Sequence, residues 1–212
     1  SEFVRTTGKN PFDLDEEDKE WIKFRSRYFT ENFMKRVRRE LDDYASVLEK
    51  SKRPLISAHA LGDERTNMFF GLDIAAWAKE GIVDAVVGYP IKMQSPDYVC
   101  ADRPTDIDMG YYAEISKNTP AKTYVDMLPR RMEPEKYVAG AMDIYKAGID
   151  GICMWDSNSR VTDPGIWAVA SRLGHADELE TISNNLGKYY KKLPVKSLGG
   201  VKVDKYPPFW GF

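Results

Sequence analysis

Three residues able to exchange protons stand at the ends of apolar runs in this chain of 212 residues. His59 lies near the end of one run, Asp126 near the end of another, and Asp156 directly follows a third. Two carboxyl groups that flank a glycosidic bond can hydrolyse it, one as proton donor and the other as nucleophile or base. A separation of about 5 Å predicts retention of configuration, and a larger gap predicts inversion. Asp126 and its alternative Asp156 are therefore candidate catalytic residues, and His59 is a candidate for bonding a substrate hydroxyl.

Aromatic and hydrogen-bonding side chains occupy comparable positions. The chain is 12% aromatic, with five Trp and twelve Tyr. Flat rings can hold the faces of sugars, while guanidinium and amide groups bind their hydroxyls. The candidate substrate-binding residues of these kinds are Tyr89, Trp155, Trp210, Arg130 and Asn158. Packing at the end of an element is the alternative role of each ring.

The proton-exchanging residues also have structural alternatives. Asp126 can cap a loop or pair with Arg130 or Arg131. The segment Asp156-Ser157-Asn158 has the composition of an ordinary turn. His59 can be a partly buried, hydrogen-bonded imidazole. The sequence leaves these alternatives open.

Several classes of site and partner are not expected. No group of His, Asp and Glu has the spacing of metal ligands, so no metal site is predicted. Cys100 and Cys153 do not form a disulfide pattern, and no glycine-rich phosphate loop suggests a cofactor. The net charge of −2 gives no footprint for nucleic acid, and no apolar run is long enough to span a membrane.

The elements that must position these residues recur along the chain. Four near-continuous apolar runs predict buried parallel strands at 54–60, 83–89, 121–127 and 149–155. They follow one another roughly every 30 residues, the length of a βαβ unit. The pattern at 79–87, a helix end, a glycine and a buried strand, repeats at 146–154.

Amphipathic segments fill the gaps between these strands. A long helix is predicted from Asp15 to about Leu48, with acidic residues at its start and basic residues after its end. Further helices are predicted over 67–80, 134–147, 164–173 and 176 to about 190, two of them closed by Gly81 and Gly148. The segment 91–109 reads as a long loop that forms one wall of a cleft.

This order predicts an α/β fold, the C-terminal half of a (β/α)8 TIM barrel in a single domain over 1–212 with a tail at 194–212. An open doubly wound sheet is the alternative architecture. Four strands cannot close a barrel that needs eight. Either four preceding units are missing, which the run Phe3-Val4-Arg5 before a long loop favours, or the half pairs with another half. We therefore expect a homodimer or an association with the missing N-terminal half.

Short motifs along the chain resemble the glycosyl-hydrolase-family-ten-like proteins, bacterial secreted or envelope proteins with a (β/α)8 barrel. The resemblance implies that the four strands are strands five to eight, and that Glu2 and Arg5 stand at the end of strand four. The family has aspartate where Glu2 stands here. The motifs are Glu2-Phe3-Val4-Arg5, Trp21-Ile22-Lys23-Phe24-Arg25, Asp73-Ile74-Ala75-Ala76-Trp77, Glu80-Gly81-Ile82-Val83-Asp84, Leu198-Gly199-Gly200 and Asp204-Lys205-Tyr206-Pro207-Pro208-Phe209-Trp210.

The expected function under this resemblance is hydrolysis of a polysaccharide or another glycan. Glu2 would donate the proton and Asp126 would attack, with Arg5 near the substrate. A non-catalytic carbohydrate-binding barrel, or an inactive half-barrel that self-assembles, is the alternative. An aldolase or isomerase would need a lysine at a strand end, and Lys122 lies at the opposite end of its strand.

Overall fold

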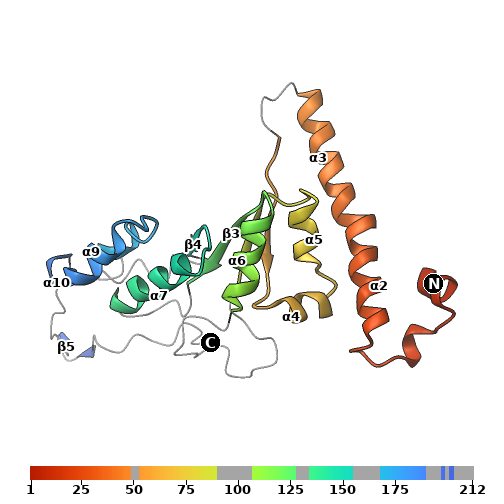
Figure 1. Cartoon of the computed structure of the whole chain (residues 1–212), viewed down its shortest axis with the longest axis horizontal. Coiled ribbons are helices and arrows are strands. Elements are labelled where there is room, and N and C mark those ends of the chain that lie inside the picture. The colour runs from red at the N-terminus through yellow and green to blue at the C-terminus, as the bar shows by residue number, and fades with distance from the viewer. Residues whose placement is uncertain are drawn as a thin grey trace.

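The computed structural model describes residues 1–48, 53–89, 107–127, 134–154, 168–189, 197–198 and 201–202. Within these residues the centre of the protein is a parallel sheet (Figure 1). Its strands are β1 (Ser57–Ala60), β2 (Ala85–Gly88), β3 (Lys122–Asp126) and β4 (Gly151–Cys153), in the order β1-β2-β3-β4. All four predicted strands are present within their predicted ranges, but β1 is not buried on both faces, because Ser57 and His59 are exposed. Among the described strands, each new strand is added on the same side of the one before it. A doubly wound sheet has a point at which the direction of strand addition reverses.

Helices follow each strand in the chain (Figure 1). Before the sheet come α1 (Glu2–Thr7), a 3-10 turn η1 (Pro11–Asp13), α2 (Lys19–Phe29), a π turn η2 (Thr30–Met34) and α3 (Lys35–Val47). The later helices are α4 (Glu64–Phe69), α5 (Ile74–Lys79), α6 (Met109–Asn118), α7 (Pro134–Lys146), α9 (Leu179–Asn184) and α10 (Leu186–Tyr189). A short antiparallel pair, β5 (Ser197–Leu198) and β6 (Val201–Lys202), lies beyond them.

The strands present alternate residues to two faces of the sheet. Ala60 lies beside Gly88, and Gly88 beside Val125, on the face that packs against helices. A Cβ on Gly88 would lie 2.3 Å from Ile107 Cδ1 and 2.9 Å from the ring of Tyr112, so only glycine permits this close approach of α6. The residues between them in sequence point to the opposite face, which we call the inner face.

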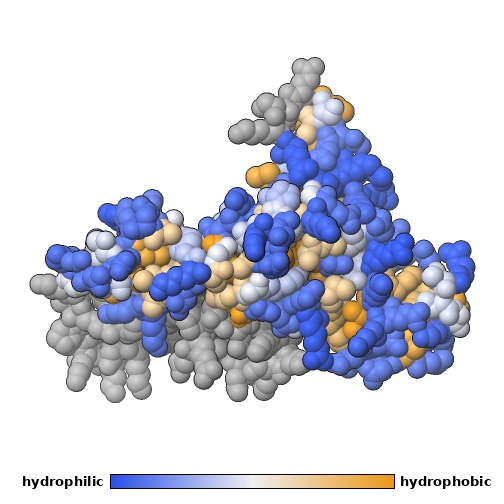
Figure 2. Space-filling model, viewed as in Figure 1, coloured by the Kyte–Doolittle hydropathy of each residue, from blue (hydrophilic) through white to orange (hydrophobic). Residues whose placement is uncertain are grey.

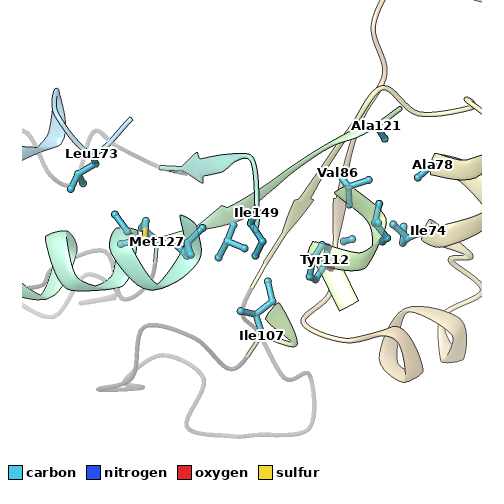
Figure 3. Packing of buried hydrophobic residues seen from close by; sticks show 14 of the residues in the cluster. Ile74, Ala78, Val86, Ile107, Tyr112, Ala121, Met127, Ile149 and Leu173 are labelled. Carbon is cyan, nitrogen blue, oxygen red and sulfur yellow. The ribbon is translucent and has the colours of Figure 1, made fainter. Parts of the chain in front are cut away.

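The hydrophobic core lies between the sheet and its helices (Figure 3). Val86 and Tyr112 are completely buried, and Ile74 of α5 is 1% exposed. The long rod of α2, η2 and α3 stands outside α5 (Figure 1) and joins the core through Met34. Trp77 of α5 donates from Nε1 to Thr30 Oγ1 at 2.7 Å, which fixes the rod against α5.

The predicted helices are confirmed in position and corrected in detail. Gly81 and Gly148 follow α5 and α7 with φ of 67° and 90°, as predicted for C-terminal caps. The predicted helix over 67–80 is two helices, α4 and α5, because Gly71 adopts φ 78° and Asp73 caps a new start. The predicted helix from Asp15 begins at Lys19 and contains the π turn η2.

Two further segments differ from expectation. The helix α6 occupies the end of the segment predicted as a loop over 91–109 and the residues that follow; Asp108 starts it by accepting from Tyr111 N at 3.0 Å. The segment predicted as a helix over 176–190 forms the shorter α9 and α10. Of the helix predicted over 164–173, residues 168–170 are helical, and 164–167 lie outside the described residues.

The edge where the strands begin, which we call the amino edge, is held by two aspartates in matching places. Asp84 Oδ2 accepts from Ile56 N at 2.8 Å, and Asp150 Oδ2 accepts from Thr123 N at 2.9 Å. Each carboxylate thus binds the backbone of the preceding strand, beside the first register pair. This repeated contact helps to fix the register between neighbouring strands.

Basic side chains neutralise both aspartates. Asp84 also accepts from the nearly buried Arg38 at 3.2 Å and from Arg53, and Lys122 Nζ lies 2.7 Å from Asp150 Oδ1. Burial alone raises the pKa of Asp84, but the Ile56 N–H and the two arginines outweigh it and lower the pKa below 3.8. The pKa of Asp150 is lowered in the same way, mainly by Lys122.

Candidate functional site

The opposite edge of the sheet, where the strands end, holds three of the predicted functional residues, His59, Tyr89 and Asp126. We call it the carboxyl edge. In parallel α/β sheets, ligands bind in the crevice at this edge, because the connecting loops meet there. His59, Val87 and Tyr124 form one row across the inner face, and Asp126 lies beside Cys153 in the next row. His59 and Asp126 therefore lie on the same face of the sheet.

Asp126 is the last residue of β3 and is completely buried. Its neighbour Met127 is buried too and donates its backbone N–H to Cys153 O at 2.9 Å, so the ladder to β4 continues past the carboxylate. Burying a carboxylate is costly, and proteins usually retain such groups for structural networks or for chemistry. This carboxylate lies on the inner face, away from the helices.

His59 differs from Asp126 in its exposure. The imidazole belongs to an exposed residue of β1, with Ser57 on the same face. Asp126 lies two strands away from His59 and two residues further along the strand direction, which places their Cα atoms on the order of 12 Å apart for regular strand spacings. A ligand of the size of a sugar ring or larger could therefore contact both.

The loop after β1 is organised by buried polar contacts. Asn67 of α4 is completely buried; its amide donates to Leu61 O at 3.0 Å and to Asp63 O at 2.8 Å, and it accepts from Leu61 N at 2.8 Å. The hydroxyl of Tyr112 also donates to Leu61 O. Asp63 caps α4 through Thr66 N at 2.7 Å. These contacts fix the chain directly beyond His59.

Sequence reasoning missed Asn67 and Tyr112 as residues that hold this loop. Burial raises the pKa of Tyr112, so its hydroxyl stays protonated and remains a donor. Burial, followed by the charge of neighbouring groups, also raises the pKa of Tyr111. Asp108 N donates to Gly62 O at 2.7 Å and ties the start of α6 to the same loop. Asn67 directly follows the polar run Glu64-Arg65-Thr66, so its position in the sequence does not indicate that it is buried.

The N-terminal residues are not at a strand end, which corrects the prediction. Glu2 and Arg5 lie in α1 and are exposed. Ser1 Oγ accepts from Val4 N at 3.4 Å, and Gly8 ends the helix with φ 72°. Phe3 is 1% exposed because it packs edge-on against Trp21 at 4.9 Å between ring centroids, which anchors this segment on α2 and not in the sheet.

The remaining predicted residues divide into two groups. Tyr89 directly follows β2, is half-buried, and donates its N–H to Ala60 O at 2.8 Å, so it lies at the carboxyl edge. Arg130, Trp155, Asp156, Asn158 and Trp210 lie outside the described residues, as does Arg131.

An aromatic cavity lies between α1, α2 and the chain after α4. It has a volume of about 550 Å³ and is lined chiefly by rings, among them Trp21, Phe24, Tyr28 and Phe70. Figure 2 shows hydrophobic surface where the N-terminal segment meets the lower end of α2. Trp21 and Phe24 are stacked, with an interplanar angle of 12°. The sequence placed these rings on the apolar face of a helix without indicating a cavity.

Arg25 supplies a positive charge in this cavity. Its guanidinium carbon lies 5.3 Å from the centroid of Trp21 and 5.7 Å from that of Phe69, and Nη2 donates to Phe69 O at 2.9 Å. These are cation–π distances. Glu2 contributes the carboxylate that lines the same cavity. The combination of stacked rings with a cation and an anion suits a ligand that has both flat faces and hydroxyl groups.

Comparison with protein-family models and with curated proteins finds no match for this chain. Among the described residues, no group of three or more His, Cys, Asp or Glu side chains could hold a metal ion. Within the same residues no helix combines the length and the apolar character needed to cross a membrane.

Proposed function

We propose that this chain is the C-terminal half of a (β/α)8 barrel that hydrolyses a glycan at the carboxyl edge of its sheet. The observation that carries the proposal is the completely buried carboxylate of Asp126 at the end of β3, on the same face as His59. In this proposal Asp126 is the nucleophile or base. Asp156, or a carboxyl from the remainder of the barrel, supplies the second acid that Glu2 in α1 does not provide.

The strand order supports the barrel part of the proposal. Among the described strands, β1 and β4 each pair on one side only, and all four run in the same direction with helices after each. Further parallel strands beside β1 and β4 would pair with the free backbone groups of these two outer strands and enclose the inner face. His59, Tyr124 and Asp126 would then point into the barrel at its mouth.

The test is release of reducing ends from a panel of glycans that includes xylan, cellulose, chitin and peptidoglycan. The chain is compared with its Asp126→Asn variant and with Asp143→Asn, a matched change of an exposed carboxylate on α7. We expect a loss of about 100-fold or more in rate for Asp126→Asn, because general acid–base or nucleophilic groups contribute at least that much. Because the second acid can come from the remainder of the barrel, the rates are also compared in the complete barrel, and equal rates for the two variants there would contradict the proposal.

The aromatic cavity favours a second candidate, a carbohydrate-binding barrel without catalysis. Tyr28 is 45% exposed and lines that cavity. Affinity electrophoresis in gels that contain each glycan separates the candidates. A binder would lose retardation with Tyr28→Ala and release no reducing ends, whereas under the hydrolase proposal Asp126→Asn loses hydrolysis whether or not retardation persists.

A further inference from the structure

The helix α3 has an apolar face beside the one that packs on the core. Thr30, Met34, Arg38 and Ala45 are the buried residues of the η2 and α3 segment. A second row recurs at spacings of three and four residues, which places it along one side of the helix. We call this row the α3 stripe; it consists of Phe33, Val37, Leu41, Tyr44 and Leu48.

The α3 stripe is open to solvent. Phe33, Tyr44 and Leu48 are 52%, 55% and 45% exposed, and Val47 beside them is 80% exposed. Figure 2 shows hydrophobic atoms at the upper end of α3, on a helix whose visible face is otherwise hydrophilic. A shallow cavity of about 420 Å³ follows the stripe; its lining residues are Asn32, Phe33, Arg36, Val37, Glu40 and Leu41.

The charges of α3 are divided between its two halves. The segment Lys35-Arg36-Val37-Arg38-Arg39 is basic, and Glu40-Leu41-Asp42-Asp43 is acidic. Arg38, Asp42 and Lys35 are engaged in ion pairs within the chain.

Arg36, Glu40 and Asp43 remain at the outer border of the stripe. All three are exposed, and at 100° per residue they lie on one side of it. The one ion pair among them, Arg36 Nε to Glu40 Oε1 at 3.9 Å, joins side chains that are 70% and 66% exposed. A pair of this kind contributes little to stability and leaves both groups available.

We propose that two copies of this chain associate through the α3 stripe, with their α3 helices antiparallel. In an antiparallel pair the basic half of each helix faces the acidic half of the other, so Arg36 lies beside Asp43 of the second copy, twice per dimer. A parallel pair would place like charges together. The antiparallel arrangement also has the two-fold symmetry of an isologous interface.

The size of the stripe predicts a weak dimer. α3 has 13 residues and is about 20 Å long. Two helices of this length bury an area at the low end of specific protein–protein interfaces, the size class in which weak and transient complexes are found. This association is independent of the proposed glycan hydrolysis, because α3 does not contribute to the carboxyl edge.

Sedimentation velocity of the complete chain, over a concentration series that reaches the high micromolar range, tests the proposal. We expect a monomer–dimer equilibrium that Arg36→Glu alone and Asp43→Arg alone each weaken by about tenfold or more, since each creates two like-charge contacts. Lys136→Glu on α7 is the matched control for an exposed basic side chain. Circular dichroism checks that each variant keeps its helices.

Two combinations identify the antiparallel geometry. The double variant Arg36→Glu/Asp43→Arg exchanges the charges and should dimerise like the original chain. An equimolar mixture of the two single variants should also recover dimers, because every contact then pairs opposite charges. A monomer at all concentrations, or dimers that the single variants do not weaken, would overturn the proposal. So would a mixture that does not recover.

Discussion

The two edges of the sheet use carboxylates in different ways. At the amino edge Asp84 and Asp150 occupy repeated positions, bind the backbone of the preceding strand and pair with basic side chains. At the carboxyl edge Asp126 is completely buried and has no acidic counterpart after β1 or β2, where the corresponding residues are Leu61 and Tyr89. A feature that repeats from unit to unit serves the fold, while one that occurs in a single unit is free to serve a site.

The largest loss of stability should come from the amino edge. Asp84→Ala removes the partner of Ile56 N, of Arg53 and of the nearly buried Arg38, and leaves a cation with reduced compensation. We expect the free energy of unfolding to fall by about 2 kcal/mol. Urea denaturation followed by circular dichroism measures this change. An unchanged midpoint would show that the amino edge does not hold the strands.

A smaller loss of stability should follow from adding a side chain at the close contact between β2 and α6. Gly88→Ala would place a methyl group against Ile107 and Tyr112, and overpacking of this kind costs about 1–2 kcal/mol. Gly81→Ala is the control for backbone conformation. No atom lies within 4 Å of a Cβ there, but φ is +67°, so we expect a cost of about 1 kcal/mol from strain alone.

The amino edge should also make the protein sensitive to acid. The pKa values of Asp84 and Asp150 are lowered from 3.8 in the folded state, so the folded state binds fewer protons than the unfolded chain near that pH. Their contribution to stability is fully present above pH 3.8 and is lost as the pH falls through the lowered values. The variant Asp84→Asn/Asp150→Asn should show a flatter dependence of unfolding free energy on pH in that window, measured by urea titrations.

The smallest effect on stability is expected at the carboxyl edge. His59 is exposed on the inner face, so His59→Ala should change the free energy of unfolding by less than about 0.5 kcal/mol. The same variant should weaken glycan retardation in affinity electrophoresis. Loss of stability without loss of binding would reverse the roles assigned to the two edges.

The sequence predicts the sheet well because buried parallel strands carry an unambiguous apolar signal. The terminal glycines are equally readable, since Gly81 and Gly148 are needed for positive φ. The helix α6 was missed because its residues mix polar and aromatic types without a clear period. The N-terminal segment was misplaced because a four-residue motif does not specify its environment, and Phe3 finds its partners on α2 through tertiary packing.

The site was only partly predictable. That His59 and Asp126 share a face follows from the two-residue period of strands and from the register. The aromatic cavity forms where α1, α2 and the chain after α4 meet. The spacing of residues along α2 does not predict that Phe70 and Gly71 line it. The hydrogen bonds of Asn67 and Tyr112 to the loop after β1 likewise depend on the packing of α4 and α6.

The division between the edges is tested most directly by comparing the same chemical change at each of them. Glycan hydrolysis by Asp126→Asn and by Asp150→Asn is measured at a temperature where both variants remain folded. We expect Asp126→Asn to lose about 100-fold or more in rate, while Asp150→Asn keeps the original rate and is less stable in urea. Equal rates in the two variants would contradict the assignment of catalysis to the carboxyl edge.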